Sequence, residues 1–184
     1  MYYFFEIYLW YGGKMTYKFC PDCGKKLVFE LAGDDGKVPY CNNCKKFWFD
    51  SFSDCVMTMV INEKKELALL HQSYLSKKYT NFVTGYIIPG ETAEEAAVRE
   101  VKEEIGVTVE KLDYSGSLWD ARGDHLMHAF IGYAHKQILN LSSEVDSARW
   151  VPFGDAKQYL YPDFDGNTQQ YLYRQYLKKL HRKA

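Results

Sequence analysis

The chain has 184 residues, a length that fits one ordinary domain or one domain beside a small module. Its 23 basic and 24 acidic side chains nearly cancel, so overall charge gives no case for a nucleic-acid binder or a membrane-surface protein. Aromatic residues make up 17% of the chain and include 16 tyrosines. A core of this size does not absorb so many, so we expect some of them in a groove or an interface.

Residues 1–16 are expected to form an extension to the folded part. The segment is apolar and aromatic, but it contains Glu6, lacks the basic start of a signal peptide and is too short to span a bilayer. Two alternatives stay open: an aromatic strand that belongs to the protein, or translation that starts at Met15. The second arises because codons for the Gly-Gly-Lys before Met15 can form a ribosome-binding site. With no export signal, we expect a cytoplasmic protein without membrane partners.

Residues 17–50 have the pattern of a small zinc ribbon. Two CxxC pairs are separated by seventeen residues, which is typical of a structural zinc site with four thiolate ligands: Cys20, Cys23, Cys41 and Cys44. Two disulfides are the alternative, which the missing export signal disfavours. Strands are expected at 26–31, 37–40 and 46–50. Their core is too small to fold alone, so metal binding would stabilise it.

Residues 51–184 alternate between strand and helix patterns. Val56–Ile61 and Leu67–Gln72 predict a hairpin, and residues 82–84 lead into the next segment. The remaining expected elements are a helix at 93–105, strands at 107–117 and 126–134 joined by a loop at 118–125, a strand at 147–151, and helices at 155–160 and 168–180. This order predicts an α/β domain with a mixed sheet between helices. Cys55, outside both cysteine pairs, is expected to be buried.

The helix at 93–105 has clear end signals. Thr92 and Glu95 form a capping box, and Gly106 is a natural stop. One side is expected to pack on the sheet through Ala97, Val98, Val101 and Ile105. Ala93 and Ala96 are expected to flank the opposite face and leave room for a phosphate.

Three acids share that opposite face. Glu100, Glu103 and Glu104 lie at positions i, i+3 and i+4. Neighbouring carboxylates repel unless cations bind, and an all-oxygen ligand set suits Mg²⁺ or Mn²⁺ rather than zinc. The alternative is a solvated helix with ordinary ion pairs. That alternative does not explain the glycines at Gly85 and Gly106 or the Pro-Gly-Glu turn between them.

This segment resembles the Nudix hydrolases, whose box reads G-x(5)-E-x(7)-R-E-U-x-E-E-x-G-U, where U is aliphatic. Every fixed position is filled, by Gly85, Glu91, Arg99, Glu100, Val101, Glu103, Glu104, Gly106 and Val107. The resemblance implies the Nudix fold, a mixed sheet sandwiched between helices, here preceded by a small zinc ribbon. It also implies hydrolysis of a phosphoric anhydride bond, with Mg²⁺ or Mn²⁺ on the three carboxylates of the helix.

The resemblance assigns roles to further residues of the box. In the family the arginine supports a carboxylate, which here pairs Arg99 with Glu103, four residues later. The residue that matches Glu91 has a structural role. A backbone carbonyl at or just before Gly90 is expected to complete the coordination of a metal ion.

The general base is left open by the sequence. Glu100 could polarise the attacking water, but many relatives use an acid from a later loop. The acids available in such a loop are Glu144 and Asp146. We favour Glu144 because its side chain is longer, and a solvated loop acid is the alternative reading.

A zinc ribbon followed by a Nudix domain resembles the NADH pyrophosphatases, which split NAD(H) into AMP and nicotinamide mononucleotide and remove NAD caps from RNA. The implied substrates are NAD(H) or a related ADP-containing dinucleotide, and NAD-capped RNA. That family has SQPWPFPxS after the box, whereas this chain has SLWDARGDH at 117–125, so we expect relaxed selectivity. In this loop Trp119 is a candidate for stacking on a base and Arg122 for contacting a phosphate.

A second function class stays open, a nucleotide-sensing or nucleic-acid-binding regulatory module that uses the zinc ribbon. The closing helix combines aromatic and basic residues, which suit either nucleic acid or an ordinary amphipathic end: Tyr171, Tyr173, Arg174 and Tyr176. Regulatory Nudix relatives often lack box carboxylates, and this chain has all of them, which favours catalysis. The oligomeric state is left open, with a homodimer among the alternatives.

Overall fold

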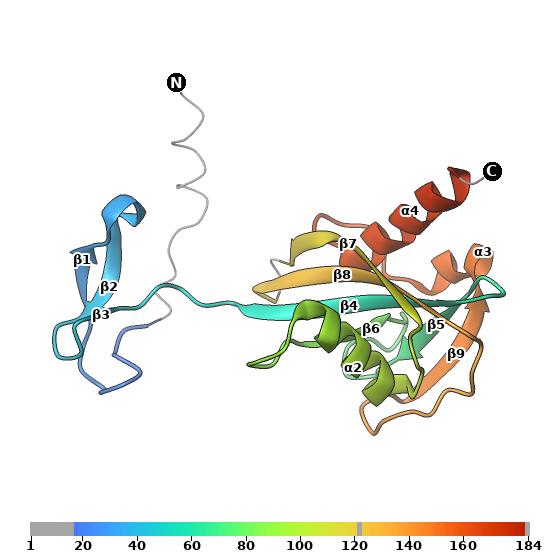
Figure 1. Ribbon diagram of the computed structural model, residues 1–184, viewed down its shortest axis with the longest axis horizontal. Helices are drawn as coiled ribbons and strands as arrows, with labels where there is room; N and C mark the ends of the chain where they lie inside the picture. Colours follow the sequence, from blue (N-terminus) through green and yellow to red (C-terminus); the bar gives the residue numbers. More distant parts are fainter. Residues whose placement is uncertain (1–16, 121–122, 183–184) are drawn as a thin grey trace. The chain divides into compact units, whose positions relative to one another are not determined.

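The computed structural model describes residues 17–120 and 123–182. The chain separates into two compact units that divide after Ser51 (Figure 1). The expectations for residues 1–16 lie outside the described residues. Among the helices that are described, none combines the length and the apolar character needed to cross a bilayer.

The first unit is a three-stranded antiparallel sheet. Its strands, in spatial order, are β1 (Val28–Leu31), β2 (Lys37–Cys41) and β3 (Lys46–Phe47). β1 and β3 are shorter than the ranges expected from the sequence. Lys26, for example, pairs only through an isolated bridge to Phe19. The small core consists of Cys20, Leu27 and Cys41, with Tyr17, Cys23, Cys44 and Trp48 packed against it.

The second unit is built on a six-stranded mixed sheet. Its strands are β4 (Ser53–Asn62), β5 (Glu66–His71), β6 (Val83–Tyr86), β7 (Lys111–Asp120), β8 (His125–Ala134) and β9 (Ser147–Pro152). The order is β7-β8-β4-β5-β9, and β6 pairs with β4. β4 and β8 are parallel, whereas the other pairs are antiparallel. The predicted mixed sheet and the β4–β5 hairpin are therefore confirmed.

Helices cover both faces of this sheet. Figure 1 shows α2 (Ala93–Ile105) on one face and α3 (Phe153–Ala156) and α4 (Thr168–His181) on the other. A 3-10 turn at Lys157–Tyr159 follows α3 directly. Side chains alternate along β4, so Met57 and Met59 join the core under α4 while Val56 and Val60 face α2. The domain is a mixed sheet between helices, as predicted.

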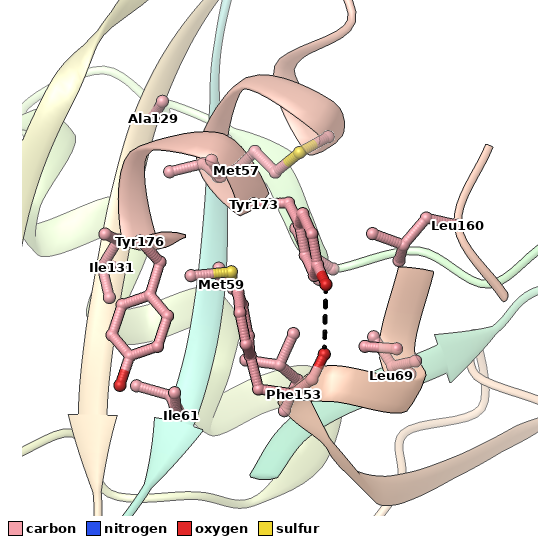
Figure 2. Packing of buried hydrophobic residues seen from close by; sticks show 14 of the residues in the cluster. Met57, Met59, Ile61, Leu69, Ala129, Ile131, Phe153, Leu160, Tyr173 and Tyr176 are labelled. Carbon is pink, nitrogen blue, oxygen red and sulfur yellow. Dashed lines mark hydrogen bonds between the residues drawn. The ribbon is translucent and has the colours of Figure 1, made fainter. Parts of the chain in front are cut away.

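The aromatic residues of α4 are part of the core. Phe153 stacks on Tyr173 with ring centroids 4.5 Å apart and meets Tyr176 edge on at 5.0 Å. The Tyr173 hydroxyl donates to the Phe153 carbonyl at 3.3 Å, the bond drawn in Figure 2. Arg174 pairs with Asp163. These residues are engaged within the domain, so α4 offers little of the aromatic surface considered for nucleic acid.

Of the six described residues in the loop expected at 118–125, four lie in strands. β7 continues to Asp120, where it pairs with His125 at the start of β8. A bulge between Tyr114 and Gly116 shifts the register of the two strands. Tyr171 donates from its hydroxyl to the Ser115 carbonyl inside this bulge. The end of β7 is held as a strand by its backbone pairing with β8. Its sequence does not alternate clearly between apolar and polar residues, so this part of the strand could not be predicted from the sequence.

Candidate functional site

Helix α2 begins and ends where the sequence predicts. Glu95 donates from its backbone N–H to the Thr92 hydroxyl at 3.2 Å, and its carboxylate accepts from the Thr92 N–H at 2.8 Å. This completes the capping box. Gly106 closes the helix in the left-handed conformation, with φ of 71°. Ala97, Val101 and Ile105 are buried, as expected.

Two expectations for the surface of α2 were wrong. Val98 is 41% exposed, and Ala96 is fully buried in a cluster with Val56 and Phe130. The buried stripe instead includes Glu104, which lies two helical turns after Ala97 and therefore on the same side of the helix. Glu104 is only 5% exposed, so the three acids do not form one exposed cluster.

Arg99 contacts three carboxylates. Its Nε and Nη2 donate to Glu91 at 2.9 and 2.6 Å. Its Nη1 donates to Glu100 at 2.7 Å and to Glu103 at 2.9 Å. The contact between Arg99 and Glu103 inferred from the resemblance is therefore present. One guanidinium partly neutralises the acids and fixes their orientation.

Glu91 connects the turn before α2 to the helix. Besides its two bonds to Arg99, it accepts a hydrogen bond from the Ile88 N–H at 2.8 Å. The bonds from Arg99, followed by the bond from Ile88, lower the pKa of Glu91 to about 2. This geometry suits the structural role expected for Glu91. Gly90 lies in the same turn with a φ of 98°, which favours glycine.

Gly85 leaves room for Glu100. It lies in β6 opposite Val56, and a Cβ atom at this position would overlap the Glu100 carboxylate. The first glycine of the box is therefore needed for close approach between strand and helix. Burial raises the pKa of Glu100, while its bond to Arg99 acts in the opposite direction.

Glu104 is a buried carboxylate with one oxygen unpaired. Its Oε1 accepts from Gln72 Nε2 at 3.1 Å, whereas its Oε2 has no hydrogen-bond partner among the described residues. Burial raises the pKa of Glu104 to about 7 and the negative charge of Glu100 adds to the shift, while the contacts with Gln72 and with the Thr84 backbone act in the opposite direction. An ionised carboxylate in this place needs a further positive partner. A divalent cation with a preference for oxygen ligands fits that need.

A cavity of about 790 Å³ brings the acids together. Glu100, Glu103, Glu104 and Glu144 all line it. Its aromatic and apolar lining consists of Cys55, Met57, Tyr74, Leu75, Tyr86, Ile88 and Tyr161. The cavity thus joins anionic oxygen ligands with surfaces on which aromatic rings can stack.

The two acids of the later loop are placed differently. Glu144 lines the cavity, but Asp146 accepts a hydrogen bond from the Ser73 N–H at 2.5 Å and lies 3.7 Å from His71 Nδ1. Asp146 therefore attaches this loop to the segment after β5. Of the two acids, Glu144 is the one that lines the cavity, and its role as general base stays a prediction.

The carboxylates are not arranged around one point. Among the described residues, only one group of three or more potential metal ligands has its ligand atoms within 4.8 Å of one another, and that group is the four ribbon cysteines. Glu100 and Glu103 are drawn to Arg99, and Glu104 to Gln72. For all three carboxylates to bind one cation, Glu100 and Glu103 would exchange their bonds to the Arg99 guanidinium for bonds to the metal.

Neither of the two predicted substrate-binding residues is found in the cavity lining: Trp119 lies outside it, and Arg122 is not among the described residues. The Trp119 ring meets Phe52 edge on at 5.4 Å and is not part of the cavity lining, and neither is Gly90. Arg122 lies outside the described residues. The same hairpin instead lines the cavity with Asp120, Gly123 and His125. The sequence pattern gives no signal for these residues, because the pairing of Asp120 with His125 is not evident from a segment that resembles a loop.

The ribbon cysteines are spaced for a metal ion. Cys20 Sγ lies 3.9 Å from Cys44 Sγ, and Cys23 Sγ lies 3.5 Å from Cys41 Sγ. A tetrahedral zinc ion with bonds of about 2.3 Å separates its sulfur ligands by about 3.8 Å. A disulfide bond is about 2.0 Å long, and all these cysteines are free thiols. The geometry fits zinc rather than two disulfides.

The two CxxC segments make the same turn. The N–H of Gly24 donates to the Cys20 carbonyl and the N–H of Lys45 to the Cys41 carbonyl, both at 2.8 Å. Gly24 has a φ of 70° and Lys45 a φ of 56°. Glycine adopts this left-handed conformation freely, whereas a residue with a Cβ atom does so at a cost.

Comparison with known proteins places the second unit in a family. The NUDIX domain family matches residues 52–174. The NAD-capped RNA hydrolase NudC of Vibrio atlanticus (strain LGP32) is 31% identical over 141 residues, which cover 75% of this chain and 51% of the relative. NudC of Vibrio vulnificus (strain CMCP6) is 30% identical over 136 residues, with coverage of 73% and 51%. The chain spans about half the length of these curated relatives.

Solved structures share the fold. A NUDIX hydrolase from Nitrosomonas europaea aligns with a TM-score of 0.63 at 16% identity, over 90% of this chain and 93% of that one. The NUDIX domain of Shewanella oneidensis NrtR, solved with ADP ribose, aligns with a TM-score of 0.60 at 17% identity, over 77% of this chain and 94% of that one. Together with the filled box and the match over residues 52–174, these findings show that the chain belongs to the NUDIX domain family.

Proposed function

We propose that the protein is a divalent-metal-dependent pyrophosphohydrolase that cleaves the diphosphate of NAD(H) or a related ADP-containing dinucleotide. The observation that carries this proposal is the cavity in which Glu100, Glu103, Glu104 and Glu144 lie among aromatic side chains. Such a cavity has places for a diphosphate and for the bases beside it. The names of the NudC relatives support the NAD-related substrate.

Three carboxylates would hold the metal ion or ions: Glu100, Glu103 and Glu104. The unpaired, buried Oε2 of Glu104 is the observation that favours a cation here. Mg²⁺ or Mn²⁺, when bound, would neutralise the diphosphate and lower the pKa of a water ligand. Arg99 orients Glu100 and Glu103 through its Nη1 and is itself held by Glu91.

Glu144 is the residue that we propose as the proton acceptor. It lines the cavity with the box carboxylates, and its loop is attached to the segment after β5 through the bond from the Ser73 N–H to Asp146. A general base needs to reach the attacking water but need not bind the metal. Glu100 is the alternative within the box, but its Oε1 is held by Arg99.

The substrate range follows from the walls of the cavity. Tyr74 and Tyr161 lie in the lining with Tyr86 and His125, and aromatic faces stack on any base without strong preference. We therefore propose that NADH, NAD and other ADP-linked diphosphates are hydrolysed within a limited range of rates. NAD-capped RNA, named for the relatives, is a further candidate substrate.

The test is a substrate screen with purified protein. NADH, NAD, ADP-ribose, FAD and diadenosine tetraphosphate are incubated with the protein in the presence of Mg²⁺ or Mn²⁺, and products are separated by chromatography. We expect AMP and reduced nicotinamide mononucleotide from NADH, with no reaction when divalent ions are chelated. Absence of turnover on every compound, with metal bound and the fold intact, would contradict the proposal and favour a nucleotide-sensing module.

A further inference from the structure

Gln72 follows directly after β5 and is a buried glutamine that contacts the site. It is 2% exposed. Its Nε2 donates both to Glu104 Oε1 and to the Tyr74 hydroxyl, each at 3.1 Å. Gln72 therefore joins a carboxylate of the box to an aromatic residue of the cavity wall.

Stability alone does not explain a glutamine at this position. The side-chain Oε1 of Gln72 is buried and has no hydrogen-bond partner among the described residues. An unpaired buried acceptor of this kind costs about 1 to 3 kcal/mol. The main-chain carbonyl accepts from the N–H groups of Leu75 and Ser76 at 2.9 and 3.1 Å, and any other residue could supply that carbonyl. The features that are specific to glutamine are the side-chain bonds to Glu104 and to Tyr74, and of these two the bond to Glu104 reaches a carboxylate of the box.

The hydrogen-bond donor to Glu104 is a neutral amide, whereas the donor to Glu100 and Glu103 is a cation. Arg99 is a cation, so it neutralises Glu100 and Glu103 while it orients them. Gln72 is neutral, so it fixes the orientation of Glu104 and leaves the full negative charge for another cation. Carboxylates that bind metals are commonly held by such hydrogen bonds from neighbouring groups.

We propose that Gln72 is a positioning residue that holds the Glu104 carboxylate by Oε1 and thereby presents Oε2 to the divalent cation. The inference rests on the proposed function, because it takes Glu104 as a ligand of the catalytic metal. The bond to Oε1 and the unpaired, buried Oε2 of the same carboxylate carry it together.

The test measures Mn²⁺ binding directly, with zinc-replete full-length protein and electron paramagnetic resonance of free Mn²⁺. Gln72→Met keeps the length of the side chain and removes the donor. We expect Mn²⁺ affinity to fall about tenfold or more, which is the range for removal of a residue that supports a metal ligand. Gln169→Met is the matched control, since it makes the same replacement at another buried glutamine, one that lies outside the cavity lining and does not contact the box carboxylates. Its Mn²⁺ affinity should stay within about twofold of wild type.

A double variant separates action through Glu104 from a general effect on the fold. Glu104→Gln should weaken Mn²⁺ binding by itself, and adding Gln72→Met to it should change the affinity no further. Unchanged affinity in Gln72→Met, or a further loss in the double variant equal to that of the single one, would overturn the proposal. If Gln72→Met does not fold, Gln72→Asn carries the same test, because it withdraws the amide by one methylene.

The outcome is distinguishable from failure of the proposed function. A wild-type protein that binds Mn²⁺ but hydrolyses no dinucleotide would contradict the proposed function, and the role of Gln72 would still be decided by the Mn²⁺ affinities. Conversely, a protein that hydrolyses NADH while Gln72→Met binds Mn²⁺ normally would contradict the role of Gln72 alone.

Discussion

Arg99 and Glu91 form a two-point ion pair, with Nε 2.9 Å from Oε2 and Nη2 2.6 Å from Oε1. The pair joins the turn before α2 to the middle of the helix, eight residues later. Nη1 of the same guanidinium remains available for Glu100 and Glu103. Glu91 thus acts on the site through Arg99 and is itself not part of the cavity lining.

This pair predicts an acid-dependent contribution to stability. The pKa of Glu91 falls from an ordinary 4.5 to about 2 in the folded protein, so its contribution is full above pH 4.5 and is lost as the pH falls toward 2. Glu91→Gln should lower the melting temperature at pH 7, and the difference from wild type should shrink below pH 4.5. Thermal melts between pH 2 and pH 7 check this. A difference that stays constant with pH would show that the charge of Glu91 is not the cause.

Glu103→Gln should slow hydrolysis about a hundredfold, because loss of one charged contact in the transition state costs about 3 kcal/mol. Glu103 is exposed at the surface of α2, so its replacement should leave the melting temperature nearly unchanged. Glu94→Gln removes an exposed acid of the same helix outside the cavity and is the control. The assignment fails if Glu103→Gln keeps near-normal kcat at saturating Mg²⁺.

Glu104→Gln should stabilise the protein at high pH in buffer without added Mg²⁺ or Mn²⁺. Because the pKa of Glu104 rises from 4.5 to about 7 on folding, its ionisation opposes folding increasingly from pH 4.5 upward and fully above pH 7. A shift of this size corresponds to about 3 kcal/mol. Denaturant unfolding at pH 4 and pH 8 tests this, and the gain should appear only at pH 8. Equal stability of the two proteins at pH 8 would refute it.

The ribbon should hold about one zinc ion per chain, separate from the metal of the cavity. Metal analysis of protein purified without chelator measures the content. Cys41→Ser should lose the ion and unfold the first unit, since its apolar core is small. Absence of zinc together with four cysteines that do not react with a thiol reagent would instead indicate disulfides.

The parts of the site that could be predicted from the sequence depend on local spacing. The ends of α2 follow from Thr92, Glu95 and Gly106, and the cysteine ligand set follows from two CxxC pairs. These signals need no knowledge of distant residues, because a cap or a metal-binding turn is formed within a few residues of the chain.

The remaining features depend on how the sheet meets the helix. Glu104 is buried on the side of α2 that packs against β4 and β6, and its partner Gln72 lies thirty-two residues earlier in the chain. Val98 has the right character for the core but lies off the buried stripe. In the sequence, Gln72 is a polar residue that follows the apolar residues of β5. This position alone does not show whether the side chain is buried beside a partner or exposed at the surface.

The two turns of the ribbon differ in how easily each can open. Lys45, with a φ of 56°, and Gly24, with a φ of 70°, both adopt the left-handed conformation. For a residue with a Cβ atom this conformation costs about 1 kcal/mol. The arm that carries Cys41 and Cys44 is therefore the weaker of the two chelating arms. On removal of zinc we expect this arm to lose its turn first, so that Cys41 becomes reactive toward thiol reagents before Cys20, which is also buried.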